Sequence, residues 1–156
     1  MNPVNNGLKR KVILMAEDDA DDRLLAKDAL AECGLADDLR FVENGEELLD
    51  FLLQRGKYDG QTPRPGLILL DLNMPVKDGR EVLKEIKTNP ALRQIPVIVL
   101  TTSRADTDID RTYLLGANSY VTKPVRYESL VEVMRAICQY WLKTVELPAP
   151  TNSTHA

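Results

Sequence analysis

The sequence lacks the features of a membrane, secreted or nucleic-acid-binding protein. No apolar run approaches the roughly 18 residues of a membrane-spanning helix, and the amino end, MNPVNNGLKRK, has no apolar core of a signal peptide. Basic residues number 20 against 24 acidic ones, for a net charge of −4, and they form no Lys- and Arg-rich run. We therefore expect a cytoplasmic protein whose main partner is neither a membrane nor a nucleic acid.

Histidine and cysteine are also scarce. The one histidine, His155, lies close to the carboxyl end, and we expect no catalytic or phosphorelay role for it. The two cysteines, Cys33 and Cys138, lie far apart within helical patterns, which predicts buried free thiols in a reducing compartment. With no His or Cys beside the acidic clusters described below, a zinc site is not indicated.

The sequence does have a regular alternation of short apolar segments and helical patterns. The apolar segments cover 11–16, 39–42, 67–71, 96–101 and 118–122, and the helical patterns cover 21–33, a stretch after Asn44, 80–87, 106–115 and 128–145. The first, third and fourth apolar segments are aliphatic throughout, which is typical of a parallel sheet covered on both faces. The prediction is an α/β protein with a doubly wound, five-stranded parallel sheet in the flavodoxin-like order 2-1-3-4-5. A domain over about 9–145 would lie between a flexible N-terminal segment, 1–8, and a disordered tail, 146–156.

Polar residues follow four of the predicted strands. They are Glu17, Asp18 and Asp19 after the first strand, Asp71 after the third, Thr101 at the end of the fourth, and Lys123 after the fifth. In open α/β sheets the ligand site lies beyond the carboxyl ends of the strands, so these side chains should converge. Carboxylates that converge repel one another and need a cation, and an oxygen-only ligand set favours a hard ion such as Mg²⁺. An ammonium and a hydroxyl opposite them suit phosphoryl oxygens, and Asp71 could be a metal ligand or a nucleophile.

With these residues the chain resembles the receiver domain of two-component response regulators, over about residues 9–143. The pair Glu17-Asp18, Asp71 in LLDLNMP, Gly79, Thr101 and Lys123-Pro124 occur in the order and spacing of that family. The resemblance implies that Asp71 accepts a phosphoryl group from a histidine kinase. It also implies that Asp18, Asp71 and the main-chain carbonyl of Asn73 bind Mg²⁺, with Glu17 acting through a water or within the acidic pocket.

The same resemblance assigns roles to the remaining site residues. Lys123 would pair with the phosphoryl group or with Asp71, and Thr101 would hydrogen-bond a phosphoryl oxygen. Tyr120 occupies the family's aromatic switch position, although a half-exposed strand tyrosine is the alternative interpretation. Thr102 departs from the Ala or Gly usual in the family, and we expect it to crowd the site or slow the attack of water.

A subgroup of the family is also indicated. Two stretches look like the small regulators paired with cyanobacterial and other bacterial phytochromes: RGKYDGQTPRPGLILLDLNMPVKDGREVL, which includes the loop before the third strand, and QYWLKTVELP. The alternative is that the loop is an incidental surface insertion.

The last helical segment suggests how the protein would signal. We expect no effector domain after the predicted domain, so output is expected through surface contacts. The helix carries two apolar stripes where one would suffice against the sheet. Tyr140, Trp141 and Leu142 at its end are candidate interface anchors of a homodimer through the fifth strand and this helix, as similar phytochrome-linked regulators form. The alternative is that they fold back on their own core. The element that phosphorylation biases would be the loop 101–106, the helix 106–115 and Tyr120.

Three other functions remain to be weighed. A phosphatase of the haloacid dehalogenase-like class needs a second Asp two residues after the nucleophile, where this chain has Asn73. A flavin-binding protein would need a Gly/Ser/Thr-rich phosphate loop after the first strand. A phosphorylation-independent binding module on the same fold is the main alternative, and the complete set of carboxylates, Thr and Lys argues against it. We expect a signalling protein that catalyses only its own phosphoryl transfer and a slow autodephosphorylation.

Overall fold

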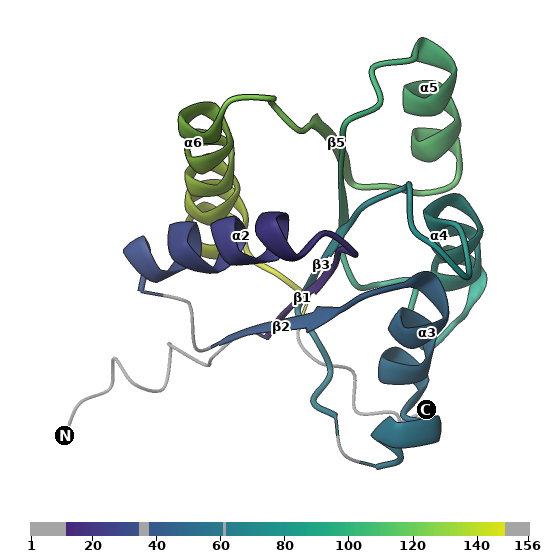
Figure 1. Cartoon of the computed structure of the whole chain (residues 1–156). Coiled ribbons are helices and arrows are strands. Elements are labelled where there is room, and N and C mark those ends of the chain that lie inside the picture. The colour runs from purple at the N-terminus through teal and green to yellow at the C-terminus, as the bar shows by residue number, and fades with distance from the viewer. Residues whose placement is uncertain (1–11, 35–37, 61, 149–156) are drawn as a thin grey trace, which may run out of the picture.

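One parallel sheet forms the centre of the structure, a computed structural model that describes residues 12–34, 38–60 and 62–148. The strand order is β2-β1-β3-β4-β5, and every neighbouring pair is parallel (Figure 1). The strands are β1 (Ile13–Ala16), β2 (Leu39–Val42), β3 (Leu67–Leu70), β4 (Val97–Thr101) and β5 (Ser119–Thr122). The predicted fold class is confirmed. The expected N-terminal segment and the tail after Pro148, with His155, lie outside the described residues.

Helices cover both faces of the sheet. Figure 1 shows α2 (Ala20–Glu32) and α6 (Tyr127–Ile137) on one face, and α3 (Gly45–Leu53), α4 (Gly79–Thr88) and α5 (Asp106–Leu114) on the other. Successive strand side chains point to opposite faces, so Leu14 and Ile68 join the core under α3 and α4, while Met15 and Leu69 join the core under α2 and α6. This double burial explains why these strands are aliphatic throughout. A short 3-10 helix, η2 (Gly56–Tyr58), lies in the predicted loop before β3.

Polar caps fix where helices begin. Asp19 accepts hydrogen bonds from the main-chain N–H groups of Asp21 and Asp22 at 2.8 and 3.1 Å. Asn44, the predicted cap of α3, accepts one from the N–H of Glu47 at 2.8 Å. Each cap satisfies N–H groups that have no partner within the helix. Asp19 is therefore the cap of α2, although its place in the sequence grouped it with the acidic residues of the site.

The end of the chain corrects the prediction of one continuous α-helix over 128–145. The α-helix ends at Ile137 and continues as a π-helix, η3 (Cys138–Thr144), in which the N–H of Val145 donates to the carbonyl of Tyr140 at 3.0 Å. Side chains of the π-helical segment pack against the core. Cys138 is buried, and Trp141 and Leu142 are partly buried against the α2 and α6 core. Tyr140 stays 53% exposed and contacts the Trp141 ring edge-on.

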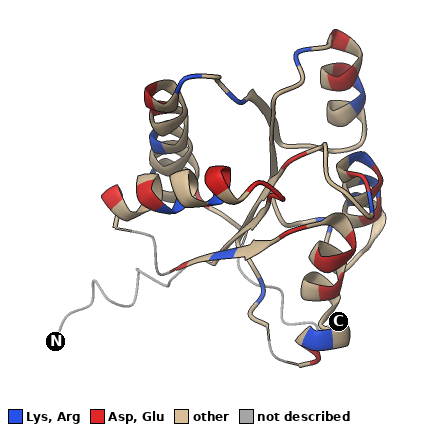
Figure 2. Cartoon of the chain, in the orientation of Figure 1, with Lys and Arg blue, Asp and Glu red and all other residues tan. Residues whose placement is uncertain are grey.

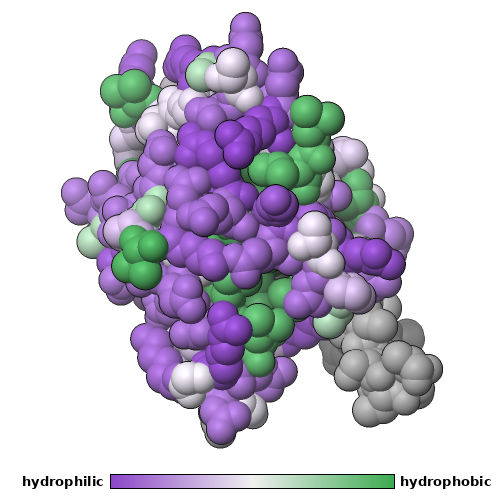
Figure 3. Space-filling model, turned by 90° about the vertical axis from the view of Figure 1, so that its right-hand side faces the viewer, coloured by the Kyte–Doolittle hydropathy of each residue, from purple (hydrophilic) through white to green (hydrophobic). Residues whose placement is uncertain are grey.

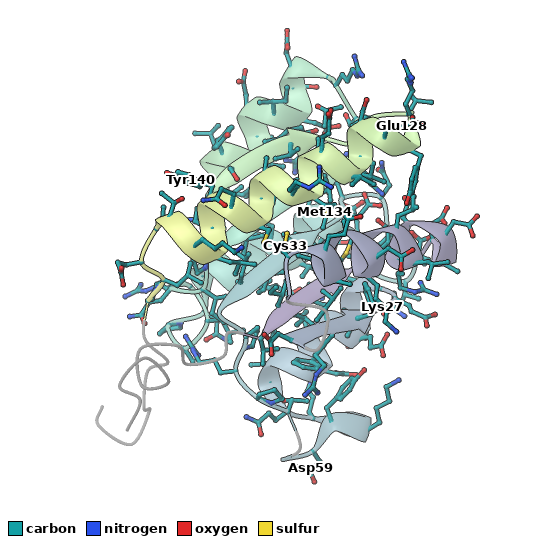
Figure 4. The ribbon with its side chains drawn as sticks, turned by 90° about the vertical axis from the view of Figure 1, so that its left-hand side faces the viewer. Lys27, Cys33, Asp59, Glu128, Met134 and Tyr140 are labelled. Atoms are coloured by element: carbon teal, nitrogen blue, oxygen red, sulfur yellow. The ribbon has the colours of Figure 1, made fainter. Side chains whose placement is uncertain are left out.

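The two cysteines, distant in sequence, come together in the fold. Both are free, Cys138 is buried and Cys33 is partly buried, so the prediction of buried thiols holds in full for Cys138 alone. Figure 4 shows Cys33 between α2 and α6. Burial and a hydrogen bond with Cys33 raise the pKa of Cys138 to about 12, which makes it a poor nucleophile.

None of the described helices has the length and apolar character needed to cross a bilayer.

Candidate functional site

The carboxyl ends of the central strands meet at one edge of the sheet, and the residues that follow them are buried there. Ala16 of β1 lies beside Leu70 of β3, so the next residues, Glu17 and Asp71, emerge together. Glu17 is 1% exposed, Asp71 7% and Lys123, after β5, 6%. Figure 2 shows the acidic residues in the loop that leads into α2 and in the first turn of that helix. Charged groups are rarely buried to this extent unless they bind one another or a ligand.

Three carboxylates form a cluster that fits a divalent cation. Glu17, Asp18 and Asp71 each offer an oxygen atom, and these atoms all lie within 4.8 Å of one another. Asp18 is exposed, so the cluster opens to solvent on its side. A set of carboxylate oxygens with positions left for water or a substrate oxygen is the kind of site that hard cations occupy.

The ammonium group of Lys123 is held by three carboxylates. Its Nζ donates to Glu17 Oε1 at 2.6 Å, to Asp22 Oδ2 at 2.9 Å and to Asp71 Oδ2 at 3.3 Å. Burial alone would lower the pKa of Lys123, but the hydrogen bonds to Asp22 and Glu17 and the charge of Asp71 raise it above its ordinary value. Lys123 is therefore a fixed positive charge beside Asp71, and all three of its protons are used.

Asp22 was not among the predicted site residues. It lies in the first turn of α2, where acidic residues are common because they stabilise the helix N-terminus. Because an acidic residue is expected at this position in any helix, its presence there did not predict the contact with Lys123, which lies 101 residues away. The only signal in the sequence was its place one turn after Asp18 at the same strand end.

Glu17 has an unusual affinity for protons. Burial raises the pKa of its carboxyl to about 7, in spite of the hydrogen bond and charge of Lys123, and the charge of Asp71 adds to the increase. Its other oxygen, Oε2, accepts a hydrogen bond from the N–H of Asp19 at 3.1 Å. Glu17 is thus shared among the lysine, the loop and the carboxylate cluster.

Thr101 places a hydroxyl group near the same edge of the sheet, and this hydroxyl makes no hydrogen bond to the described residues. Its side chain is fully buried, and its Oγ1 has no hydrogen-bond partner in the part of the chain that the structure describes. The main-chain carbonyl of Thr101 accepts from the N–H of Lys123 at 2.7 Å, which ties the ends of β4 and β5 together. Buried hydroxyls without a partner are uncommon, and the Oγ of Ser119 is the other one among the described residues.

The loop after Asp71 packs closely on the strand end. The N–H of Asn73 donates to Asp71 Oδ1 at 3.1 Å, and the N–H of Gly79 donates to the carbonyl of Leu72 at 2.9 Å. A Cβ at Gly79 would lie 2.4 Å from the carbonyl oxygen of Asp71, so only glycine allows this approach. The loop thereby orients the Asp71 carboxylate. Val76 within it has φ +69°, a left-handed conformation that is strained for a β-branched residue.

Comparison with known proteins identifies the family. Residues 13–135 match the response regulator receiver domain. The chain belongs to this family. It is 46% identical over 139 residues to the response regulator Rcp1 of a Synechocystis species, covering 89% of this chain and 94% of Rcp1. It is 39% identical over 140 residues to FilR2 of Methanothrix harundinacea, a probable methanogenesis regulatory protein, covering 89% of this chain and 88% of FilR2.

Solved structures show the same likeness. The phosphorylated cyanobacterial phytochrome response regulator RcpA superposes with a TM-score of 0.86 at 42% identity, over 90% of this chain and all of that one. The Mn²⁺-bound form of Rcp1 superposes with a TM-score of 0.83 at 45% identity, over 89% of this chain and 99% of that one. Receiver domains are signalling proteins and generally not enzymes.

In this receiver domain a polar network joins the end of β4 to α4, α5 and β5. The hydroxyl of Tyr120 donates to the carbonyl of Ser103 at 3.0 Å, and Tyr120 is half-buried against the core. The hydroxyl of Ser103 donates to Asp108 Oδ2 at 2.6 Å, and Asp108 is also paired with Arg80. Of the nine residues of α5, all of them described, Thr112 alone is buried, so α5 is held to α4 mainly by polar contacts that the sequence did not reveal.

The structure brings some of the predicted site residues together and separates others. Glu17, Asp18, Asp71 and Lys123 converge, with Thr101 at the end of the neighbouring strand, and their functional roles remain predictions. Thr102 is exposed. Tyr140 lies at the far end of the last helical segment from Glu128 (Figure 4), so Tyr140, Trp141 and Leu142 are no part of this site.

Proposed function

We propose that this receiver accepts a phosphoryl group from a histidine kinase on Asp71, in a reaction that depends on Mg²⁺. One observation carries the proposal. The buried Asp71 carboxylate lies between a carboxylate cluster that fits a divalent cation and a buried lysine, at a sheet edge where Thr101 keeps a buried, unpartnered hydroxyl. The relatives support it, since one is a phosphorylated regulator and another a Mn²⁺-bound one.

Each residue then has a chemical task. A carboxylate oxygen of Asp71 forms the new O–P bond while the N–P bond of the kinase phosphohistidine breaks, and that electron pair stays on the imidazole. Asp18, Asp71 and the Asn73 carbonyl, with Glu17 through a water or within the acidic pocket, would hold Mg²⁺, which neutralises charge on the phosphoryl oxygens. Lys123 donates to a phosphoryl oxygen from the other side, and Thr101 supplies its hydroxyl. Hydrolysis of the acyl phosphate by water is slow and returns the resting state.

The signal leaves the site through the end of β4. When the Thr101 hydroxyl turns to a phosphoryl oxygen, the following loop moves, and with it the Ser103 carbonyl that Tyr120 binds. The equilibrium between two arrangements of Tyr120 and α5 then shifts.

The kinase that this receiver serves is of the phytochrome type. The support is the likeness to RcpA, which is a cyanobacterial phytochrome response regulator, at 42% identity over nearly the whole length. Phosphotransfer from a bacterial phytochrome kinase should be faster than from an unrelated histidine kinase, and equal rates would contradict the pairing.

The decisive experiment for phosphorylation uses acetyl phosphate. Incubation of the protein with this small phosphoryl donor and Mg²⁺ should add the mass of one phosphoryl group, and omission of Mg²⁺ should prevent it. Asp71→Ala should remove the response, while Asp28→Ala, an exposed carboxylate on α2, should leave it intact. A response that survives Asp71→Ala would sink the proposal. No response at all would favour the phosphorylation-independent binding module.

We further propose a homodimer through β5 and the last helix. Strand β5 is an edge of the sheet and its residues are only partly buried. Tyr140 lies on the side of the final helix that faces away from α2 (Figure 4), and it is exposed. The opposite side of the molecule, over α3 to α5, is largely hydrophilic with separate hydrophobic patches (Figure 3). Trp141 and Leu142 pack against their own core, so Tyr140 is the anchor that remains free for a partner.

Sedimentation of the wild type and two matched variants tests the dimer. Tyr140→Ala should dissociate it, whereas Leu53→Ala, on α3 and on the other face of the sheet, should not, although Leu53 is also exposed, at 38% against 53% for Tyr140. A wild-type monomer at tens of micromolar would rule the dimer out.

A further inference from the structure

Asp22 contacts the site lysine but belongs to a different element from the other acceptors. Its Oδ2 lies 2.9 Å from Lys123 Nζ, and its side chain is 28% exposed. Glu17 and Asp71 directly follow strands, whereas Asp22 belongs to α2. The main-chain N–H of Asp22 donates to the Asp19 cap, so the first turn of the helix fixes where the carboxylate lies.

The surroundings make this contact strong. Asp22 and Lys123 border a gap in the core that is too narrow for a water molecule and is otherwise lined by apolar side chains, among them Met15, Leu100 and Met134. Charges that face such a region are poorly screened, so they interact more strongly than on an open surface. The nearest basic neighbour on α2, Arg23, donates to the carbonyl of Glu17 and reaches toward Glu43, so it does not neutralise Asp22.

The three contacts of Lys123 are not equivalent in the proposed reaction. A cation at the carboxylate cluster competes with Lys123 for Glu17 and Asp71, which belong to that cluster. Asp22 lies outside the cluster and keeps its bond to the ammonium when the other two carboxylates turn to the metal. A phosphoryl group on Asp71 adds about −1.5 to −2 charges that must share Lys123 with Asp22.

We propose that Asp22 is a positioning residue that holds Lys123 toward α2 and competes with the phosphoryl group for it. This inference rests on the proposed phosphorylation of Asp71. Asp22 then has opposite effects on cation binding and on the phosphorylated state. Its negative charge strengthens cation binding, and its hold on Lys123 weakens the phosphorylated state and shortens its lifetime.

Asp22→Asn tests this, with Asp21→Asn as the matched control. Both substitutions remove one carboxylate from the same helical turn, but the side chain of Asp21 is exposed. Calorimetry without a phosphoryl donor measures the Mg²⁺ affinity. Titration with beryllofluoride at saturating Mg²⁺ measures the affinity for a phosphoryl mimic. Asp22→Asn should weaken Mg²⁺ binding by about fivefold and tighten beryllofluoride binding by about fivefold, and Asp21→Asn should change each by less than about twofold.

The outcomes separate the possibilities. Equal effects of the two variants would overturn the positioning role. A loss of both affinities in Asp22→Asn would also overturn it, because the loss of a merely structural residue weakens the binding of Mg²⁺ and of beryllofluoride together. Asp22→Glu, which keeps the charge, should retain wild-type Mg²⁺ affinity, and its failure to do so would also count against the proposal. Wild-type protein that binds no beryllofluoride would overturn the proposed function itself, and this inference with it, whatever the variants do.

Discussion

Arg80 on α4 and Asp108 on α5 form a two-pronged ion pair. The Nε atom of Arg80 lies 3.0 Å from Oδ1 of Asp108, and its terminal nitrogen lies 2.9 Å from Oδ2. The hydrogen bonds from Arg80 and then from Ser103 lower the pKa of the Asp108 carboxyl. Because α5 buries so little, this pair is its main connection to α4. The hydroxyl of Ser103, which donates to the same carboxylate, links α5 to the loop that follows Thr101.

Breaking this pair should loosen α5. Arg80→Ala should speed amide hydrogen exchange in α5 and cost about 1 kcal/mol of folding free energy, since planar, partly buried Arg–carboxylate pairs are stronger than exposed ones. Arg135→Ala, which removes the exposed pair with Glu32, is the control and should leave α5 exchange unchanged. Equal protection of α5 in both variants would contradict the anchoring role.

The raised pKa of Glu17 predicts how metal affinity depends on pH. A metal ion binds the ionised carboxylate, and with a pKa of about 7 most Glu17 is protonated at pH 6 and ionised at pH 8. Mg²⁺ affinity should therefore rise about tenfold between these values and level off above them. Calorimetric titrations across the range measure it. In Glu17→Gln the rise over this window should disappear, and a rise that persists would assign the proton to another group.

The unpartnered hydroxyl of Thr101 predicts opposite effects on stability and ligand binding. Thr101→Val keeps the shape and removes the hydroxyl, so it should raise the free energy of unfolding by about 1 kcal/mol. The same variant should bind beryllofluoride more weakly, because the proposed partner of the phosphoryl oxygen is gone.

Thr112 provides the comparison for Thr101. Its hydroxyl is equally buried but donates to the carbonyl of Asp108 at 2.8 Å, so Thr112→Val should lower stability. Chemical denaturation of both variants decides the point, and a loss of stability in Thr101→Val would mean that its hydroxyl has a partner in the resting protein.

The strained loop after Asp71 offers a stabilising substitution. Val76 is 80% exposed at φ +69°, so Val76→Asn should relieve backbone strain with little loss of burial and stabilise the fold by about 1 kcal/mol. Val125, which is 97% exposed and not in this conformation, provides the control. Val125→Asn should change stability by less than about 0.5 kcal/mol, and equal effects in the two variants would argue against strain at Val76.

Much of the fold was predictable because burial leaves a local pattern. Strands buried on both faces must be aliphatic throughout, and β1, β3 and β4 are. The side chains after these strands share one edge because the strands are parallel, which is why Glu17, Asp71, Thr101 and Lys123 could be grouped from their places in the sequence. The π-helical turn after Ile137 was not predictable, since the same apolar spacing also suits a regular α-helix.

The sequence by itself determined where the strands lie along the chain, the edge at which the polar residues emerge and the family to which they belong. Only the tertiary structure decided that Lys123 binds Asp22 and that Arg80 holds α5 through Asp108. It also decided that the hydroxyl of Thr101 has no partner among the described residues. The physical reason is that the burial of one face of a helix or strand produces a repeating pattern of apolar residues along that element. A contact between elements depends on how their helices and strands are packed, and the spacing of residues along the chain does not record that.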